Sequence, residues 1–433
     1  MVPAFCGFAA EALCSDGLTA QLLARRHVGR PGRRLWARGC DAGGAAANCV
    51  ATEQTLRSAD GDVACHVTVR GSVPLLWAQP PDLRPKPRIR LVPPPGEPGW
   101  AASLAAYRTH QAALRGAYGG PVTSLSLLRH RGREAPLADA FQAAASEAGA
   151  PGDTHIAFDF NARAGASPQG RAALLGLLRP HLRSAGVFHR RSAGGKASRR
   201  QAGVLRVNCL DVLDRTNMAQ AAAAGLAAAM QLAALRGEQA APPAEAIRSD
   251  DAAANDADPP LPAPLAAALA SLWRAHGDAV AMQYTRTGAQ RRDRSAPASV
   301  AAFAAVARDA LISLRRYVQN NHGDAAACDA AALLAGTHRA SRSGESPFPR
   351  GFAARAAHIA RRVPLLQAAL LLCAGRAASA LRGLATLSGD LTGGTAAFSL
   401  WATAAMALGH VALRHGGAFV ARPLFALDAQ AQR

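Results

Sequence analysis

Aromatic and charged residues are both scarce in this sequence. Of the 433 residues, 5% are aromatic and 18% are charged, whereas half are hydrophobic. A core built from this chain must therefore consist mainly of alanine, leucine and valine. The apolar composition excludes a disordered acidic chain and a fibrous repeat. The length allows one large domain or two to three ordinary ones.

Lysine is almost missing, with Lys86 and Lys196 the two examples, so nearly every basic residue is arginine. The formal net charge is +20. Such an excess predicts affinity for anions, which here means phosphorylated lipid headgroups, an anionic membrane surface or nucleic acid. The chain has no recognised nucleic-acid module and no basic stripe interleaved with aromatics. We therefore expect a lipid and a membrane as partners, and no nucleic acid.

The eight cysteines show no C-x-x-C spacing, and no cysteine and histidine group has zinc-ligand spacing. Low cysteine usage in a chain of this length predicts a reducing compartment without a disulfide framework. We expect no metal and no cofactor. The apolar start carries Glu11 and lacks a basic region, so we do not interpret it as a signal peptide.

Hydrophobic periodicity alternates between strand-like and helix-like stretches, which predicts an α/β fold. Predicted strands lie at 50–52, 63–69, 89–92, 156–160 and 203–207. Predicted helices lie at 101–116, 137–148, 170–182, 216–236, 265–283 and 299–319. The low-complexity stretch at 237–264 is rich in alanine, proline and aspartate, and we expect it to be a disordered insertion.

The segment 201–217 contains the pattern C-x₅-R-T, from Cys209 to Thr216. A strand, a tight loop and a helix starting near Thr216 are expected there. Backbone N–H groups of 210–215 would then converge at the positive end of the helix dipole, where a phosphate group binds.

Each residue type in this pattern suits phosphoryl transfer. Cys209 would lie at the bottom of the loop, where the backbone dipoles and Arg215 lower its pKa and favour the thiolate. The guanidinium of Arg215 can bind two phosphate oxygens at once, and the Thr216 hydroxyl can donate a hydrogen bond to the thiolate. Attack of sulfur on phosphorus would give a cysteinyl-phosphate that water hydrolyses, without a metal.

The complete word around Cys209, R-x-N-C-x-D-x-L-D-R-T-N-x-x-Q, resembles the signature of the Sac-domain phosphoinositide phosphatases. Further similar stretches follow in family order between about residues 20 and 336, at 33–54, 70–79, 158–160, 273–289 and 313–329. The resemblance implies a mixed β-sheet flanked by helices, with the C-x₅-R-T phosphate loop between a strand and a helix. It also implies a catalytic domain over 1–345 that removes a phosphate, most specifically from phosphatidylinositol 4-phosphate.

The sequence departs from the family pattern in three places and at its start. Val212 replaces a second motif cysteine, Asn161 follows the F-D-F word in place of histidine, and the 285–295 loop lacks the usual lysines. The β-rich subdomain that precedes the catalytic domain in the family is expected to be missing. The altered loop and the missing subdomain keep open a second hypothesis, a catalytically weak scaffold or lipid-binding pseudophosphatase. A protein tyrosine phosphatase shares the chemistry, but the interior of the motif points away from it.

The remaining site residues are assigned with less support. Asp211, two residues after the nucleophile, is the favoured general acid, with Asp159 as a weaker candidate. Asp214 is expected to contact the substrate or to hold the Arg215 guanidinium in an ion pair. The other residues expected to bind substrate or brace the loop are Arg206, Asn208, Thr216 and Asn217.

The C-terminal part differs in kind from the rest. An apolar run at 364–375 and an uncharged run at 393–409 predict a helical hairpin within 363–433, preceded by a basic linker at 346–362. Arginines flank the hairpin on its outer sides, so a membrane-spanning hairpin would have both ends in the cytosol. Arg376 would be costly within a span, and a soluble hairpin packed on the core is the alternative. The tail is similar to that of the membrane-anchored Sac member of the endoplasmic reticulum and Golgi, which implies that location with the catalytic domain facing the cytosol.

Overall fold

The computed structural model describes residues 4–91, 93–163, 165, 167–192, 195–238, 260–290, 300–336, 364–385, 391–414 and 420. Most of the predicted insertion and the whole predicted linker at 346–362 lie outside these residues. The end of the predicted insertion is helical, because a helix begins at Ala263.

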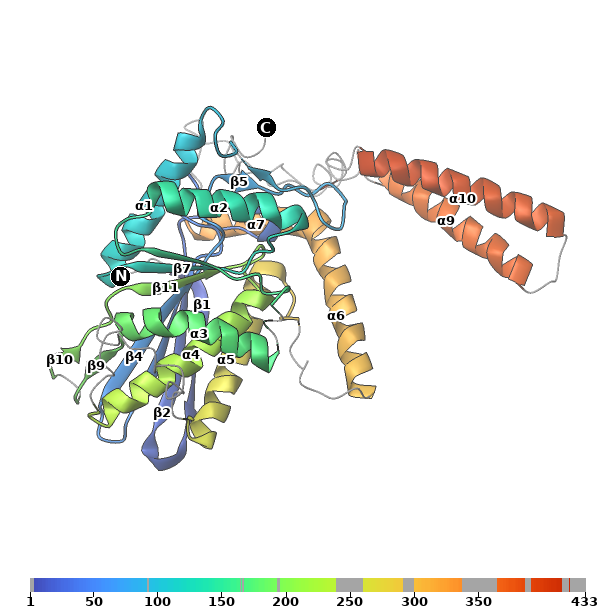
Figure 1. Ribbon diagram of the computed structural model, residues 1–433. Coiled ribbons are helices and arrows are strands. Elements are labelled where there is room, and N and C mark those ends of the chain that lie inside the picture. The colour runs from blue at the N-terminus through green and yellow to red at the C-terminus, as the bar shows by residue number, and fades with distance from the viewer. Residues whose placement is uncertain are drawn as a thin grey trace.

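A nine-stranded mixed sheet forms the centre of the protein (Figure 1). Its strands are β1 (Ala4–Leu13), β2 (Thr19–His27), β3 (Val50–Arg57), β4 (Val63–Arg70), β7 (Val122–Ser126), β8 (Thr154–Ala157), β9 (Phe188–Arg190), β10 (Ala197–Arg199) and β11 (Val204–Asn208). The main path runs β1-β2-β3-β4-β11-β7-β8. The first four strands pair antiparallel, whereas β11 runs parallel to both β4 and β7. A separate two-stranded sheet pairs β5 (Trp77–Ala78) with β6 (Arg90–Leu91).

Helices cover both faces of the sheet, as expected for an α/β fold. They are α1 (Trp100–Tyr118), α2 (Ala135–Ala148), α3 (Pro168–Ala185), α4 (Asp214–Leu235) and α5 (Ala263–Thr285). Two more helices, α6 (Val300–Val318) and α7 (Asp324–Leu334), lie beside this layered core. Alternation along β11 decides what each face contacts: Leu205 and Val207 pack with α3 and α4, whereas Val204 packs with α1. The mixed sheet flanked by helices confirms the predicted fold class.

Several elements were not predicted. The elements that lie outside the predicted segments are β1, β2, β5, β7, β9, β10 and α7. β1 is an edge strand whose residues are half-buried or exposed, so it lacks a clear inside and outside to produce an alternating pattern. The helices predicted at 265–283 and 299–319 are confirmed as α5 and α6.

Two further helices, α9 (Pro364–Ala385) and α10 (Leu391–Arg414), pair with each other as a hairpin (Figure 1). Among the described residues, α4 is the one helix that is long and apolar enough to cross a membrane, and half of that stretch is buried inside the protein. Its residues pack in the core, so it serves as a core helix. The apolar part of α10, Thr395–Val411, is shorter. The membrane-spanning character of the hairpin therefore stays a prediction.

Candidate active site

The loop that carries Cys209 leaves the end of β11 and enters α4. Cys209 directly follows β11 and is buried, and α4 begins at Asp214, two residues before the predicted start. Within the loop, Val212 has a φ of 53°, a left-handed conformation that is strained for a β-branched residue. The Val212 carbonyl accepts hydrogen bonds from Asn48 Nδ2 at 3.5 Å and Arg70 Nη1 at 3.4 Å. The strained turn is thus held by two buried side chains, Asn48 just before β3 and Arg70 at the end of β4.

The guanidinium of Arg215 is bound to the carboxylate of Glu134 in this structure, so it is not open to a phosphate. Nη1 and Nη2 each lie 2.9 Å from a different carboxylate oxygen of Glu134, and Nη1 also donates to the Leu127 carbonyl at 2.8 Å. Burial alone would lower the pKa of Arg215, but Cys209 and the Glu134 carboxylate raise it. The guanidinium is therefore charged, and a carboxylate takes both donors that a phosphate would use.

Asp211 is held by two arginines. Its Oδ1 lies 2.5 Å from Arg38 Nη2, and its Oδ2 lies 3.2 Å from Arg34 Nη2. Burial raises the pKa of this carboxyl, but Arg34 and Arg38 outweigh that effect and hold it well below its usual range. Asp211 is thus ionised at neutral pH in this state, which is not the form that a general acid needs.

Arg70 is a buried cation beside the loop that the sequence reading did not include among the site residues. The side chain is fully buried, and Nε donates to Gln220 Oε1 at 2.7 Å. Burial lowers the pKa of Arg70 to about 10, although Cys209 and Asp214 oppose this effect by stabilising its charge. The resemblance of 70–79 to a family stretch was the signal that could have identified it.

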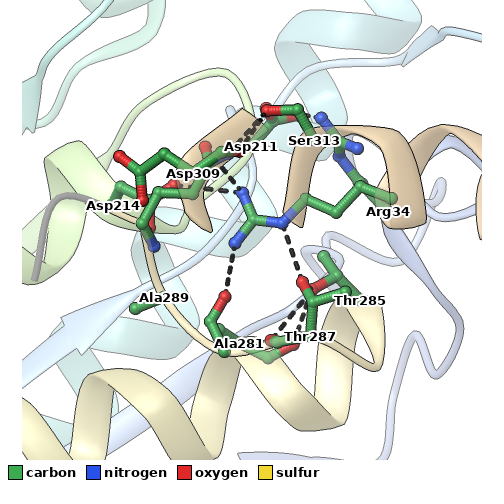
Figure 2. A network of polar contacts seen from close by, with 12 residues as sticks. Arg34, Asp211, Asp214, Ala281, Thr285, Thr287, Ala289, Asp309 and Ser313 are labelled. Carbon is green, nitrogen blue, oxygen red and sulfur yellow. Dashed lines mark hydrogen bonds and ion pairs between the residues drawn. The ribbon is translucent and has the colours of Figure 1, made fainter. Parts of the chain in front are cut away.

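Asp214 is not the partner of Arg215, contrary to one predicted role. Its Oδ1 accepts a hydrogen bond from the Gln290 backbone N–H at 2.7 Å, and its Oδ2 lies 3.1 Å from Arg316 Nη1. Arg316 also donates to Thr287 Oγ1 at 2.9 Å, and Figure 2 shows Asp214, Thr287 and Ser313 around this network. Asp214 therefore joins the start of α4 to α6 and to the loop after α5.

Arg206 lies on the wrong side of the sheet to bind a substrate phosphate directly. It is fully buried, and alternation along β11 places its side chain on the α1 face. Its guanidinium donates to His110 Nε2 at 3.2 Å, to the Ser72 carbonyl and to Asn208 Oδ1 at 2.7 Å. The structure therefore does not place Arg206 where the predicted substrate contact needs it, and instead pairs it with Asn208, the residue before Cys209.

Thr216 and Asn217 begin α4 just inside the loop. The Thr216 side chain is fully buried, and its hydroxyl has no hydrogen-bond partner among the described residues. That unpaired group is compatible with the predicted bond to the nucleophile or to a phosphate oxygen. Asn217 packs against Gly277 of α5, where an added Cβ would come within 2.8 Å of its amide.

Asp159, the weaker acid candidate, holds a turn. Its carboxylate accepts hydrogen bonds from the backbone N–H groups of His130 at 3.0 Å, Asn161 at 3.1 Å and Ala162 at 3.0 Å. Burial raises its pKa, but these backbone bonds outweigh burial and lower it. An acceptor-only, ionised carboxylate of this kind is a poor proton donor.

Comparison with known proteins gives concordant matches. The family model described as the SacI homology domain matches residues 1–165. The chain is 32% identical over 343 residues to Phosphoinositide phosphatase SAC6 of Arabidopsis thaliana, covering 78% of this chain and 53% of that protein. The chain belongs to the Sac-domain phosphoinositide phosphatase family.

Other Sac-domain relatives match over a similar extent. The phosphatidylinositol-3-phosphatases SAC1 of Drosophila melanogaster and of Saccharomyces cerevisiae are 32% and 29% identical, over 73% and 76% of this chain and 50% and 51% of their own lengths. The chain therefore spans about half the length of the curated relatives that it matches. The predicted Sac-domain resemblance is confirmed.

Within this Sac domain, Cys209 and Asp211 lie in the loop after β11 and Arg215 lies in the first turn of α4. The structure adds partners that lie far away in the sequence. Arg34, Arg38 and Arg70 come from the N-terminal region, and Glu134 comes from the start of α2. Among the described residues, no three histidine, cysteine, aspartate or glutamate side chains are grouped to hold a metal ion.

Proposed function

We propose that this Sac-domain protein is a phosphoinositide phosphatase that hydrolyses a phosphomonoester through a cysteinyl-phosphate on Cys209. The substrate that we propose is phosphatidylinositol 4-phosphate. The observation that carries the proposal is the placement of Cys209 between the end of β11 and the start of α4, with Arg70 bound to the Val212 carbonyl of the same loop and Arg215 in the first turn of α4. A helix start and two cations suit a phosphate dianion.

In the first step, the substrate phosphate replaces the Glu134 carboxylate on the Arg215 guanidinium. The Cys209 sulfur forms a bond to phosphorus, the bond from phosphorus to the inositol oxygen breaks, and a proton goes to that oxygen. In the second step, water attacks phosphorus, the Cys209 thiolate leaves, and inorganic phosphate is released. Backbone N–H groups of 210–215 and the Arg215 guanidinium stabilise the charge that develops on the phosphoryl oxygens.

Asp211 remains our candidate for the proton donor, and we expect it to take up a proton only when substrate is bound. A phosphate dianion near Arg34 and Arg38 would compete with the Asp211 carboxylate for ion pairs with these arginines. This competition would weaken the two contacts that keep Asp211 ionised. Its pKa would then rise toward the range in which a carboxylic acid can give up a proton to a leaving group.

We further propose that the α9 and α10 hairpin anchors the catalytic domain on the cytosolic side of the endoplasmic reticulum or Golgi membrane. The pairing of the two helices and the uncharged stretch Thr395–Val411 support this arrangement. Arginines on the outer flanks support cytosolic ends.

The test of the activity is phosphate release from a panel of the three monophosphorylated phosphoinositides, with wild type against Cys209→Ser. We expect release from the 4-phosphate to exceed release from the 3- and 5-phosphates, and Cys209→Ser to release none. The names of two relatives specify the 3-phosphate, so the panel decides between the positions.

The second candidate function is a lipid-binding protein with weak or no turnover. The contact between Glu134 and Arg215 favours it, because that contact takes the phosphate-binding donors. Wild-type protein that binds the lipids of the panel and releases no phosphate from any of them would establish this function in place of the first.

A further inference from the structure

Helix α6 carries apolar side chains on its outer side. Leu311, Leu314 and Val318 are three and four positions apart, so they lie along one face of the helix. Their exposed fractions are 48%, 60% and 47%, and Val306, nearer the start of the helix, is 67% exposed. Figure 1 shows α6 running along the flank of the domain. A contiguous exposed stripe of this kind is typical of a surface that binds a partner.

The opposite side of α6 holds the helix to the active site. Arg316 is buried and reaches Asp214 at the start of α4, at 3.1 Å. Ser313 Oγ accepts a hydrogen bond from Gln290 Nε2 at 2.7 Å. Arg316 thus faces the protein, whereas the two leucines face outward. The exposed Arg308 and Arg315 also lie on the outer surface of the helix. An amphipathic helix on a soluble domain usually turns its leucines to the core.

A basic segment, residues 84–90, lies next to this helix. Tyr317 of α6 donates a hydrogen bond from its hydroxyl to the Leu83 carbonyl at 2.8 Å, directly before the segment. The segment has four cations within seven residues, and three of them are exposed: Lys86, Arg88 and Arg90. The remaining cation, Arg84, is half-buried and lies 3.6 Å from Asp82.

The basic segment is also tied to the catalytic loop. Gln79 Nε2 donates to the Pro87 carbonyl at 2.9 Å, while Gln79 Oε1 accepts from Arg38 Nη2 at 2.9 Å. The same Arg38 nitrogen contacts Asp211 of the catalytic loop. Both the apolar face of α6 and the basic segment are therefore one or two side chains away from the loop that carries Cys209.

We propose that the apolar face of α6, with the basic segment beside it, docks the catalytic domain on an anionic membrane surface. Leucine and valine side chains on one face of a helix insert at the boundary between headgroups and acyl chains. Lysine and arginine beside them are attracted to anionic headgroups. The pairing of apolar and basic groups favours a lipid surface over a protein partner. The proposal rests on the proposed function, in that the substrate phosphate lies on such a surface.

The first experiment measures docking without catalysis. An environment-sensitive fluorescent amino acid is placed at position 314 of the full chain, which is reconstituted in phosphatidylcholine vesicles with and without phosphatidylserine. We expect blue-shifted emission that brominated lipids quench, with both effects stronger when phosphatidylserine is present. The same label at position 177, an exposed leucine of α3, should show neither effect.

A blue shift at 314 without quenching by brominated lipid would mean that protein covers the helix, either the α9 and α10 hairpin or a second copy, and would overturn the proposal. Unshifted emission in both vesicle types would overturn it too.

The second experiment separates docking from chemistry. The double variant L311E/L314E is compared with wild type and with L177E, on phosphoinositide in anionic vesicles and on a short-chain phosphoinositide in solution. We expect the double variant to lose roughly tenfold or more on vesicles, since exposing one buried leucine corresponds to about a factor of ten. Activity on the soluble substrate should be unchanged, and L177E should match wild type on both.

Equal losses on both substrates would contradict membrane docking. If wild type is inactive on both substrates, the proposed function fails, while the fluorescence at position 314 still decides whether α6 docks.

Discussion

Both carboxylate oxygens of Glu134 lie 2.9 Å from the terminal guanidinium nitrogens of Arg215. This is the two-bond geometry with which an arginine binds a phosphate. The contact is partly buried, with side-chain exposed fractions of 14% for Arg215 and 12% for Glu134. A substrate phosphate and the Glu134 carboxylate therefore compete for one binding group.

From that competition we predict that Glu134→Gln lowers the KM for a short-chain phosphoinositide severalfold and leaves kcat nearly unchanged. The amide keeps the shape of the side chain but removes the charge that opposes the phosphate. Steady-state kinetics on the soluble substrate measures both constants. The control is Glu147→Gln, which changes a glutamate near the end of α2 that accepts a hydrogen bond from Trp100 of α1. A fall in kcat at unchanged KM would show instead that Glu134 orients Arg215 for catalysis.

Cys209→Ser is expected to abolish turnover while lipid binding persists. A serine hydroxyl at its ordinary pKa is a poor nucleophile, but the loop backbone and Arg215 that hold the phosphate remain in place. Phosphate release and vesicle co-sedimentation report the two properties separately. Turnover close to that of wild type would exclude the covalent mechanism on Cys209.

We predict that Arg215→Lys is nearly as damaging as the loss of the nucleophile. An ammonium group is a point charge and cannot form two parallel hydrogen bonds to phosphoryl oxygens. Loss of such a transition-state contact reduces kcat by roughly 10²-fold or more. The measurement is kcat on the preferred monophosphate from the panel. A variant that keeps most of its activity would mean that the loop does not bind phosphate through Arg215.

Asp324, at the start of α7, should give folding stability a characteristic pH dependence. Its side chain is buried, both carboxylate oxygens lack a hydrogen-bond partner among the described residues, and burial raises its pKa from 3.8 to about 6 despite nearby arginines. Because the folded state holds this proton more tightly than the unfolded chain does, the group's contribution to stability is fully present below the unfolded pKa. That contribution declines as the pH rises through the folded pKa.

Asp324→Asn removes this dependence, because an amide does not ionise. The variant should gain stability relative to wild type by roughly 3 kcal/mol at about pH 7.5 and about half of that at about pH 5. Urea unfolding of both proteins at the two pH values gives the comparison. A relative stability that is the same at both pH values would show that folding does not raise the pKa of Asp324.

The membrane anchor is tested by extraction. We expect the full chain to resist carbonate extraction from endoplasmic-reticulum membranes, and a chain that ends at Gly351 to remain in the soluble fraction. The first outcome requires the α9 and α10 hairpin to enter the membrane, and Arg376 and Arg382 must then reach an interface or face the other helix. Release of the full chain by carbonate would identify the hairpin as a packed soluble element.

The sequence by itself determined the local features of the site. The apolar run before Cys209, the C-x₅-R-T spacing and the alanine-rich stretch after Thr216 predict a strand, a loop and a helix, and β11, the loop and α4 follow that order. Such features depend on residues that are neighbours in the chain, so periodicity and spacing reveal them. The Sac-domain resemblance was readable for the same reason, since it rests on short words in a fixed order.

The electrostatic environment of the loop was decided by the tertiary structure alone. Glu134 lies 81 positions from Arg215, and Arg38 lies 173 positions from Asp211. Asp211 looked like an acid because of its place beside Cys209, but two arginines from another part of the chain keep it ionised. Arg206 looked like a phosphate ligand, but alternation along β11 turns it to the opposite face. The sequence pattern of charged side chains does not predict which distant residue each one contacts. Only the packing of the sheet and its helices brings these groups together and sets their protonation.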